Sequence, residues 1–251
     1  MGDGIMLHRV MSAAPRFTFV PTNPNAAPGF TFINDGHGNW RIKFLTSGTL
    51  IFQSTLSHGI DVFLVGGGGG GAGWSSTMSA GAGGGAGYTK TQKGVAVTRE
   101  TAYSITIGAG GAGKSSSGTG PGSATGNAGG ATSAFGYTAN GGGAAKAGYS
   151  YYPETYNYNW ADGGNGGSGG AAGGQGKGGT NGGNGTAGGV ERPTVGHGQG
   201  TTTREFGEPD GDLYAKGGGT DTVAIANSGN GGKQGNNAGS SGIVVIRNHR
   251  E

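Results

Sequence analysis

Glycine recurs at every third position from Asp162 to Gly189, and this spacing constrains the fold more than any other feature of the chain. Positions 164, 167, 170, 173, 176, 179, 182, 185 and 188 are all glycine. A period of three is the repeat of a polyproline-II-type helix, which makes no internal hydrogen bonds. Collagen shares this period but needs abundant proline, and the stretch contains none. The pattern therefore favours extended helices that bond to their neighbours.

Glycine makes up 65 of the 251 residues, so the fold has few side chains to stabilise it and depends on its backbone. Glycine loses more conformational entropy on folding than any other residue. What can offset this loss is the pairing of N–H and C=O groups, and glycine helices can lie close together because no Cβ separates them. We therefore expect a bundle of polyglycine-II helices. A flexible linker is the alternative, and the strict period argues against it.

The expected fold class is all-β or irregular, with two parts. Residues 1–56 contain little glycine and predict a small β module, with strands at 16–20 and 30–33 and a hairpin at 40–53 that turns at Ser47-Gly48. Residues 57–251 predict a glycine-rich domain of polyglycine-II helices bordered by short β-strands. The border strands are expected at 59–65, 94–98, 102–107 and 242–247.

The segment YSITIGAGGAGKSSSG, residues 103–118, matches two nucleotide-binding motifs. Gly108, Gly113, Lys114 and Ser115 fit the P-loop pattern, and the glycines at 108, 110 and 113 fit the dinucleotide pattern. Both mechanisms need a helix to begin at the motif, and the Ser- and Gly-rich residues that follow do not favour one. We therefore expect a border strand that runs into a glycine helix, with Lys114 as a solvated side chain at its edge.

The remaining composition argues against several classes of function. The net charge is only +3 and the basic residues are scattered, so nucleic-acid binding is not expected. There is no cysteine, the five histidines are spread along the chain, and no nucleophile motif occurs. We expect no enzyme activity, no cofactor and no metal. No apolar run is long enough to predict a membrane span.

Three inserts interrupt the glycine tracts, at 74–80, 149–160 and 190–214, and we expect them to form exposed tips. Tyrosine and tryptophan are favoured at recognition surfaces because they combine a large rigid area with a polar group. The candidate receptor-binding residues are Tyr149, Tyr151, Tyr152, Tyr156, Tyr158, Trp160, Trp74, Arg192, His197 and Arg204. The alternative is that these rings pack on one another or on a neighbouring subunit.

The third insert is polar and carries charges of both signs. Its acidic residues Glu208, Asp210 and Asp212 alternate, which would suit calcium through carboxylate oxygens. The spacing and closing glutamate of an EF-hand are missing, so a solvated loop is the favoured interpretation.

The order of these pieces resembles the glycine-rich domain of bacteriophage tail and tail-fibre proteins over about residues 57–248. The resemblance rests on five segments in sequence: DVFLVGGGGGGAG, GGGAGY, VAVTRETAYSITIGAGGAG, SAFGYTANGGGA and GSSGIVVIR. A similar arrangement occurs in the ectodomain of anaplastic lymphoma kinase-type receptors, which contain cysteines, so the phage resemblance is favoured.

The resemblance implies a virion structural protein of the tail or tail fibre, acting outside the host cell. In some members the loops that join the glycine helices bind the host surface. The expected partners are other tail proteins, further copies of this chain as a homo-oligomer such as a trimer, and a host glycan or outer-membrane protein. Two alternatives stay open: a purely architectural joint or decoration protein, and a free surface adhesin or ice-binding protein.

Overall fold

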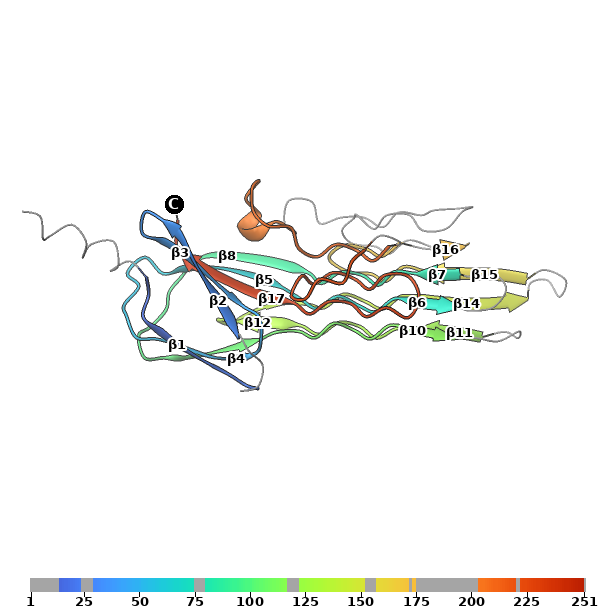
Figure 1. Cartoon of the computed structure of the whole chain (residues 1–251), viewed down its shortest axis with the longest axis horizontal. Helices are drawn as coiled ribbons and strands as arrows, with labels where there is room; N and C mark the ends of the chain where they lie inside the picture. Colours follow the sequence, from blue (N-terminus) through green and yellow to red (C-terminus); the bar gives the residue numbers. More distant parts are fainter. Residues whose placement is uncertain are drawn as a thin grey trace, which may run out of the picture.

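The computed structural model has an elongated shape built almost entirely from β-strands and extended segments (Figure 1). It describes residues 14–23, 29–74, 80–116, 122–151, 157–171, 173–174, 203–219 and 222–250. These residues contain no α-helix, and one 3-10 turn, η2, spans Glu205–Gly207. Within them, no helix is long and apolar enough to cross a membrane. The expectation of an all-β chain is therefore confirmed.

Two five-stranded antiparallel sheets form one end of the molecule (Figure 1). Sheet A has the order β1 (Phe17–Pro21), β4 (Gly48–Phe52), β9 (Ala102–Thr106), β12 (Thr132–Ala134), β13 (Tyr137–Ala139). Sheet B has the order β2 (Phe30–Gly36), β3 (Asn39–Phe44), β17 (Ile243–Asn248), β5 (Ile60–Val65), β8 (Thr89–Val95). Both sheets thus combine strands that lie far apart in the sequence.

A hydrophobic core fills the space between sheets A and B. Alternate residues of β3 (Trp40, Ile42 and Phe44) and of β4 (Leu50 and Phe52) are buried in it. This period of two is what a strand with one buried face requires. The two sheets therefore form a sandwich held by apolar side chains of the kind that the glycine tracts lack.

Strands β5 and β17 are buried on both faces, because a second apolar cluster covers the outer face of sheet B. Phe63 of β5 and Val245 of β17 lie in this cluster, together with Phe206 and Ala215. The segment from Thr203 to Lys216 therefore covers sheet B opposite the main core.

The predicted hairpin at 40–53 is wrong. Its two strands form, as β3 and β4, but β3 pairs with β2 and β17, whereas β4 pairs with β1 and β9. Both strands carry large apolar residues at alternate positions. These residues face one another across the core, because the two strands lie in opposite sheets instead of pairing in one. The connection at residues 45–47 therefore carries the chain from one sheet to the other, and Gly48 already belongs to β4.

The sandwich is continuous across residue 56, where the sequence predicts a boundary between two parts. Strand β4 bonds to β9, and β3 bonds to β17, so the strands of residues 1–56 share both sheets with later strands. They also share one core with them, since Ile42 and Leu50 belong to the same cluster as Ile105.

Two small sheets lie at the other end of the molecule (Figure 1). One has the order β10 (Lys114–Ser116), β6 (Ala72–Trp74), β7 (Ala80–Ala82), and the other β11 (Gly122–Thr125), β14 (Lys146–Tyr151), β15 (Asn157–Asp162), β16 (Gly173–Gly174). Ala72 and Ala82 of the first sheet cluster with Ala147 and Ala161 of the second. Small methyl groups thus replace the large side chains of the sandwich core.

Glycine-rich segments join the two ends, and residues 66–71 lie among six of them. The backbone N–H groups of residues 66–71 donate in turn to carbonyl groups of three segments. Gly66 and Gly69 donate to residues 85–88, Gly67 and Gly70 to residues 127–130, and Gly68 and Gly71 to residues 237–240. Three more segments donate to carbonyl groups of this stretch: residues 111–114, residues 142–145 and the segment that contains Gly232. The partner of each successive group therefore changes with a period of three.

Close packing explains why these positions are glycine. A Cβ on Gly68 would lie 1.9 Å from the carbonyl oxygen of Asn230, and one on Gly87 would lie 1.9 Å from that of Gly66. Such distances are far below van der Waals contact, so a side chain would force the segments apart. Ala109 and Ala112, by contrast, are exposed on the outside of the bundle.

The P-loop-like segment belongs to this arrangement. Gly108 and Gly111 are buried between segments, and a Cβ on either would lie within 2.1 Å of a carbonyl oxygen. The residues that follow, Lys114–Ser116, form strand β10 instead of the helix that phosphate binding requires. Lys114 is exposed, as expected.

We predict that Gly68→Ala lowers the free energy of unfolding by about 3 kcal/mol or more, because its methyl group has no space between the segments. Gly36→Ala is the control. A Cβ there meets nothing within 4 Å, and only the positive φ of 78° opposes it, at a cost of about 1 kcal/mol. Denaturant unfolding of both variants checks the difference, and equal stability would contradict this account of the packing.

Candidate functional site

The aromatic strands of the predicted recognition site lie at the end of the molecule farthest from the sandwich (Figure 1). Tyr149 and Tyr151 are on β14, Tyr158 and Trp160 on β15, and Trp74 ends β6. Strands β14 and β15 pair antiparallel, and β14 also contacts β6. The fold therefore brings together the backbone of residues from two inserts that are far apart in the sequence.

The other predicted site residues are not part of this group. Tyr152, Tyr156, Arg192 and His197 lie outside the described residues. Arg204 directly precedes η2, which contacts β5 of sheet B, and its Nη1 donates to the carbonyl oxygen of Gly211 at 3.1 Å. The structure therefore separates Arg204 from the aromatic strands.

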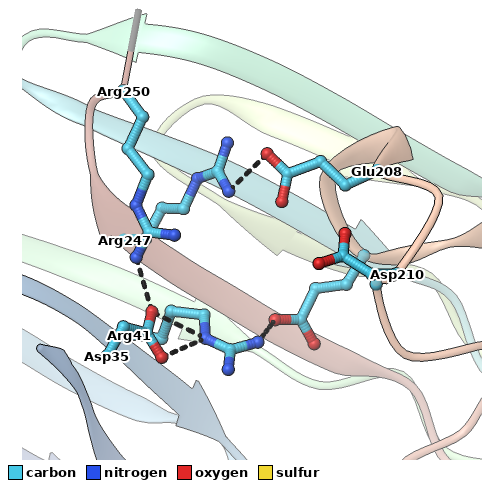
Figure 2. A pocket seen from close by; sticks show the side chains of 8 residues that line it. Asp35, Arg41, Glu208, Asp210, Arg247 and Arg250 are labelled. Carbon is cyan, nitrogen blue, oxygen red and sulfur yellow. Dashed lines mark hydrogen bonds and ion pairs between the residues drawn. The ribbon is translucent and has the colours of Figure 1, made fainter.

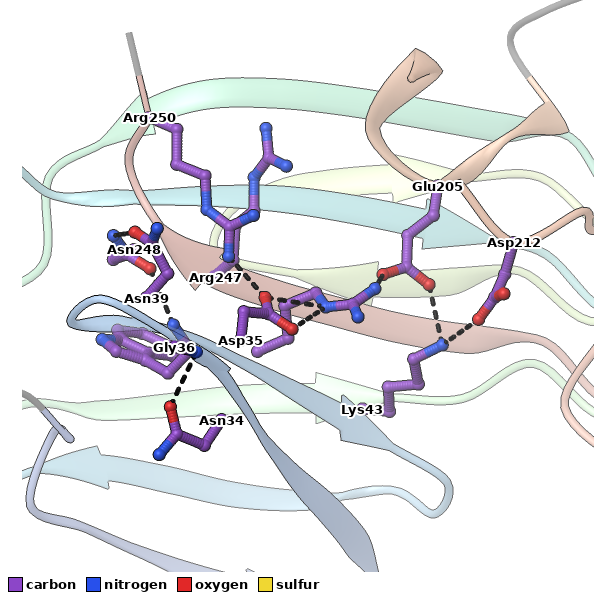
Figure 3. Close-up of polar contacts among 12 residues, drawn as sticks. Asn34, Asp35, Gly36, Asn39, Lys43, Glu205, Asp212, Arg247, Asn248 and Arg250 are labelled. Atoms are coloured by element: carbon purple, nitrogen blue, oxygen red, sulfur yellow. Dashed lines mark hydrogen bonds and ion pairs between the residues drawn. The ribbon is translucent and has the colours of Figure 1, made fainter. Parts of the chain in front are cut away.

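The described part of the third insert is bound to sheet B by a network of charged side chains (Figure 3). The Glu205 side chain is only 1% exposed, and its carboxylate lies 2.6 Å from Arg41 Nη1 and 2.8 Å from Lys43 Nζ. Tyr214 donates its hydroxyl to the same carboxylate at 3.1 Å. A second carboxylate, Asp212, lies 2.6 Å from Lys43 Nζ. The described part of this insert is therefore anchored to sheet B through buried Glu205, while Asp212 and Leu213 stay exposed.

Arg247 forms a second, deeper part of the network. Its side chain is 1% exposed, with Nε 3.0 Å from Asp61 Oδ2 and Nη1 2.7 Å from Glu208 Oε1. Its guanidinium carbon lies 4.1 Å from the centre of the Phe206 ring, which adds a cation–π contact. Arg247 therefore holds the insert through both a charge and an aromatic ring.

Burial and neighbouring charges shift the pKa values of two groups around Glu205, Lys43 and Tyr214. Burial alone would lower the pKa of Lys43, but hydrogen bonds to Asp212 and Glu205 outweigh it, and the pKa is raised. Burial raises the pKa of Tyr214 to about 12. Lys43 therefore stays charged and Tyr214 stays a hydroxyl donor throughout the neutral pH range.

The aspartates of the network show the reverse shift. Burial opposes ionisation of Asp61, but hydrogen bonds from His249, the Gly94 N–H and Arg247 hold its pKa below the usual value. The pKa of Asp35 is also lowered, because hydrogen bonds from its arginine partners outweigh burial. Both carboxylates are therefore ionised at neutral pH.

A pocket of about 240 Å³ opens among these side chains (Figure 2). Its arginines Arg41, Arg247 and Arg250 are each paired with a carboxylate, whereas the side chain of Asp210 forms no ion pair with the described residues. The lining residues include no hydroxyl or thiol nucleophile. Among the described residues, no group of acidic, histidine or cysteine side chains is arranged to hold a metal ion. The network is therefore suited to fastening a segment to the sheet.

Sequence reasoning missed this network, although one signal was present. Arg41 and Lys43 alternate with the buried Trp40, Ile42 and Phe44, which places both charges on the outer face of one strand. Their acidic partners in the insert, Glu205 and Asp212, lie more than 160 residues away. Nothing in the local pattern of residues 205–212 indicates which strand they meet.

We predict that Glu205→Gln lowers the free energy of unfolding by about 2 kcal/mol, because it removes the buried charge that Arg41 and Lys43 share and leaves each cation with a single carboxylate partner. Glu100→Gln is the matched control, since it removes an exposed pair with Arg99 and should change stability by less than about 1 kcal/mol. Denaturant unfolding measures both changes. If Glu205→Gln proves as mild as Glu100→Gln, the network does not hold the insert.

Acid should weaken the same network. Asp35, Asp61 and Asp212 all have a pKa below the usual value in the folded protein. Such groups contribute stability that is fully present above the unfolded pKa of about 3.9 and is lost as the pH falls through the folded pKa. We predict a Tm that changes little from about pH 7 to 5 and falls below about pH 4. A constant Tm down to about pH 2 would contradict this.

Comparison with known proteins places the chain in a family. Residues 46–248 match the family described as a glycine-rich domain. This range extends from the connection between β3 and β4 to the last residue of β17 and includes the glycine segments between the two ends. No curated protein matches the chain. The chain belongs to the glycine-rich domain family.

Proposed function

We propose that the glycine-rich segments are polyglycine-II helices. The support is the hydrogen bonding of residues 66–71, whose partners rotate among neighbouring segments with a period of three. Residues 83–88 behave alike: Gly83 and Ala86 donate to residues 168–171, and Gly85 and Tyr88 donate to 140–143. Three residues per turn without internal hydrogen bonds is the geometry of this helix.

We further propose that the protein is a structural component of a bacteriophage tail or tail fibre. The main support is the resemblance of its ordered strand and glycine segments to those of phage tail proteins. The architecture suits such a role, because a bundle with six bonded neighbours around a central segment resists bending without a large apolar core. In this proposal the protein acts in the virion, outside the host cell, and catalyses no reaction.

Host recognition is assigned in this proposal to the end formed by β6, β14 and β15. The observation that carries it is that two separate aromatic inserts meet there, at the end opposite the sandwich (Figure 1). The partner would be a host glycan or an outer-membrane protein, and several copies per particle would add avidity to weak single contacts. The sandwich would then attach to other tail proteins or to further copies of this chain.

A purely architectural role is the second candidate. Leu213, Val223 and Ile225 are each more than half exposed, and apolar side chains of this kind suit contacts with neighbouring subunits. In that case the aromatic strands would also be buried between subunits. The two candidates predict different results when the aromatic residues are changed.

The first experiment asks whether the protein is in the particle. Particles whose genome encodes this chain are purified, and mass spectrometry and immunogold labelling should find the protein on the tail. A protein that is absent from purified particles, or that labels only the capsid, would contradict the tail assignment.

The second experiment tests recognition. We predict that the double variant Tyr151→Ala, Trp160→Ala reduces adsorption to host cells by about tenfold or more, with an unchanged yield of particles. Phe32→Ala, which removes a partly exposed ring from the sandwich, is the control and should adsorb normally. Unchanged adsorption of the double variant would contradict the recognition site, and failure of particles to assemble would favour the architectural role.

A further inference from the structure

A second cavity lies in the sandwich, at the end opposite the aromatic strands. It has a volume of about 500 Å³, within the range of small-ligand sites. Its walls come from the end of β8, from β9 and from the β12–β13 hairpin. Neither the charged network nor the proposed recognition end contributes to it.

The lining of this cavity is uncharged and combines aromatic rings with hydroxyl groups. Tyr103, Phe135 and Tyr137 supply the rings, and Ser104, Ser133 and Thr138 carry aliphatic hydroxyls. The remaining lining residues are small or aliphatic. None of these three hydroxyls forms a hydrogen bond with another described residue.

Two of the rings are held in place before any ligand arrives. The Tyr103 hydroxyl accepts a hydrogen bond from the Thr98 N–H at 2.7 Å, and the Phe135 ring centre lies 5.0 Å from that of Tyr103. Lys90 Nζ lies 5.6 Å from the centre of the Tyr137 ring, a cation–π distance that fixes the third ring. Because these rings are already ordered, they lose less conformational entropy when a ligand binds to them.

Phe135 adopts a strained backbone conformation at this cavity. Phe135 and Gly136 form the two-residue turn of the β12–β13 hairpin, with φ of 53° and 80°. A turn with both φ values positive normally takes Asn-Gly or Asp-Gly, and a bulky residue in the left-handed region costs about 1–2 kcal/mol. Strain of this kind is characteristic of functional sites, and here it places an aromatic ring against the cavity.

We propose that this cavity binds a neutral sugar ring. A pyranose has apolar C–H faces that stack on aromatic rings and hydroxyls that bond to serine and threonine. No charged residue lines the cavity, since Lys90 contacts the Tyr137 ring without being part of the lining, and this disfavours phosphorylated or carboxylated ligands, which need cationic partners. The inference rests on the cavity alone and does not depend on a phage origin or on the aromatic end.

The experiment measures binding of the purified full chain to neutral oligosaccharides of glucose, galactose and N-acetylglucosamine by calorimetry. Sialylated and uronic-acid oligosaccharides serve as charged comparisons. We expect at least one neutral oligosaccharide to bind. Phe135→Asn and Tyr137→Leu should each weaken this binding by about tenfold or more. Because asparagine suits the turn, Phe135→Asn should leave the Tm unchanged or raise it.

His37→Asn provides the matched control. His37 and Gly38 form the corresponding turn of the β2–β3 hairpin, with φ of 51° and 82°, and do not line the cavity. This variant relieves the same kind of strain and should bind like the original protein. The proposal is overturned if no neutral oligosaccharide binds at millimolar concentration, if only charged ones bind, or if both cavity variants bind normally. A marked fall in the Tm of Phe135→Asn would show that the ring serves packing, and it would also count against the proposal.

Discussion

The structure depends on backbone hydrogen bonds between glycine segments that lie in direct contact. In an ordinary sheet each strand bonds to two neighbours, whereas residues 66–71 bond to six. This is possible because successive groups point in three directions, and because no Cβ holds the segments apart. Each bond adds only about 1 kcal/mol net, so stability comes from their number and from the exclusion of water between segments. The high entropic cost of ordering glycine is offset in this way.

The sandwich fixes the register of the glycine segments, which their own backbone hydrogen bonds specify only weakly. Backbone bonds between similar glycine tracts specify register weakly, because one tract resembles another. The strands at their ends carry distinctive side chains, such as Phe63 of β5 and Val244 of β17, which fit one position in the core. Each glycine segment therefore starts at a position that a conventional hydrophobic core determines. The charged network around Glu205 and Arg247 fastens the third insert to the same base.

Features that depend on short stretches of sequence were predicted correctly, whereas features that depend on contacts between distant residues were not. The strands at 59–65, 102–107 and 242–247 are confirmed within one residue at each end, because alternation or a continuous apolar run indicates them locally. The P-loop-like segment was also interpreted correctly as non-helical. The hairpin at 40–53 and the strand expected at 94–98 were wrong: β3 and β4 belong to different sheets, and β8 spans Thr89–Val95, where it pairs with β5. The proposed sugar cavity has no signal in the sequence beyond an unusual Phe-Gly turn.

The amino-acid sequence alone indicates that backbone hydrogen bonds hold most of this chain together. Its glycine content, its period of three and its few large apolar residues exclude helical bundles and a single large core, since those need side chains to pack. The folded structure is needed to show which segments are neighbours, that Glu205 pairs with both Arg41 and Lys43, and that β6 contacts β14. The physical reason is that glycine tracts are interchangeable by pattern. Their order in space is set by the few side chains at their ends, whose partners lie more than a hundred residues away.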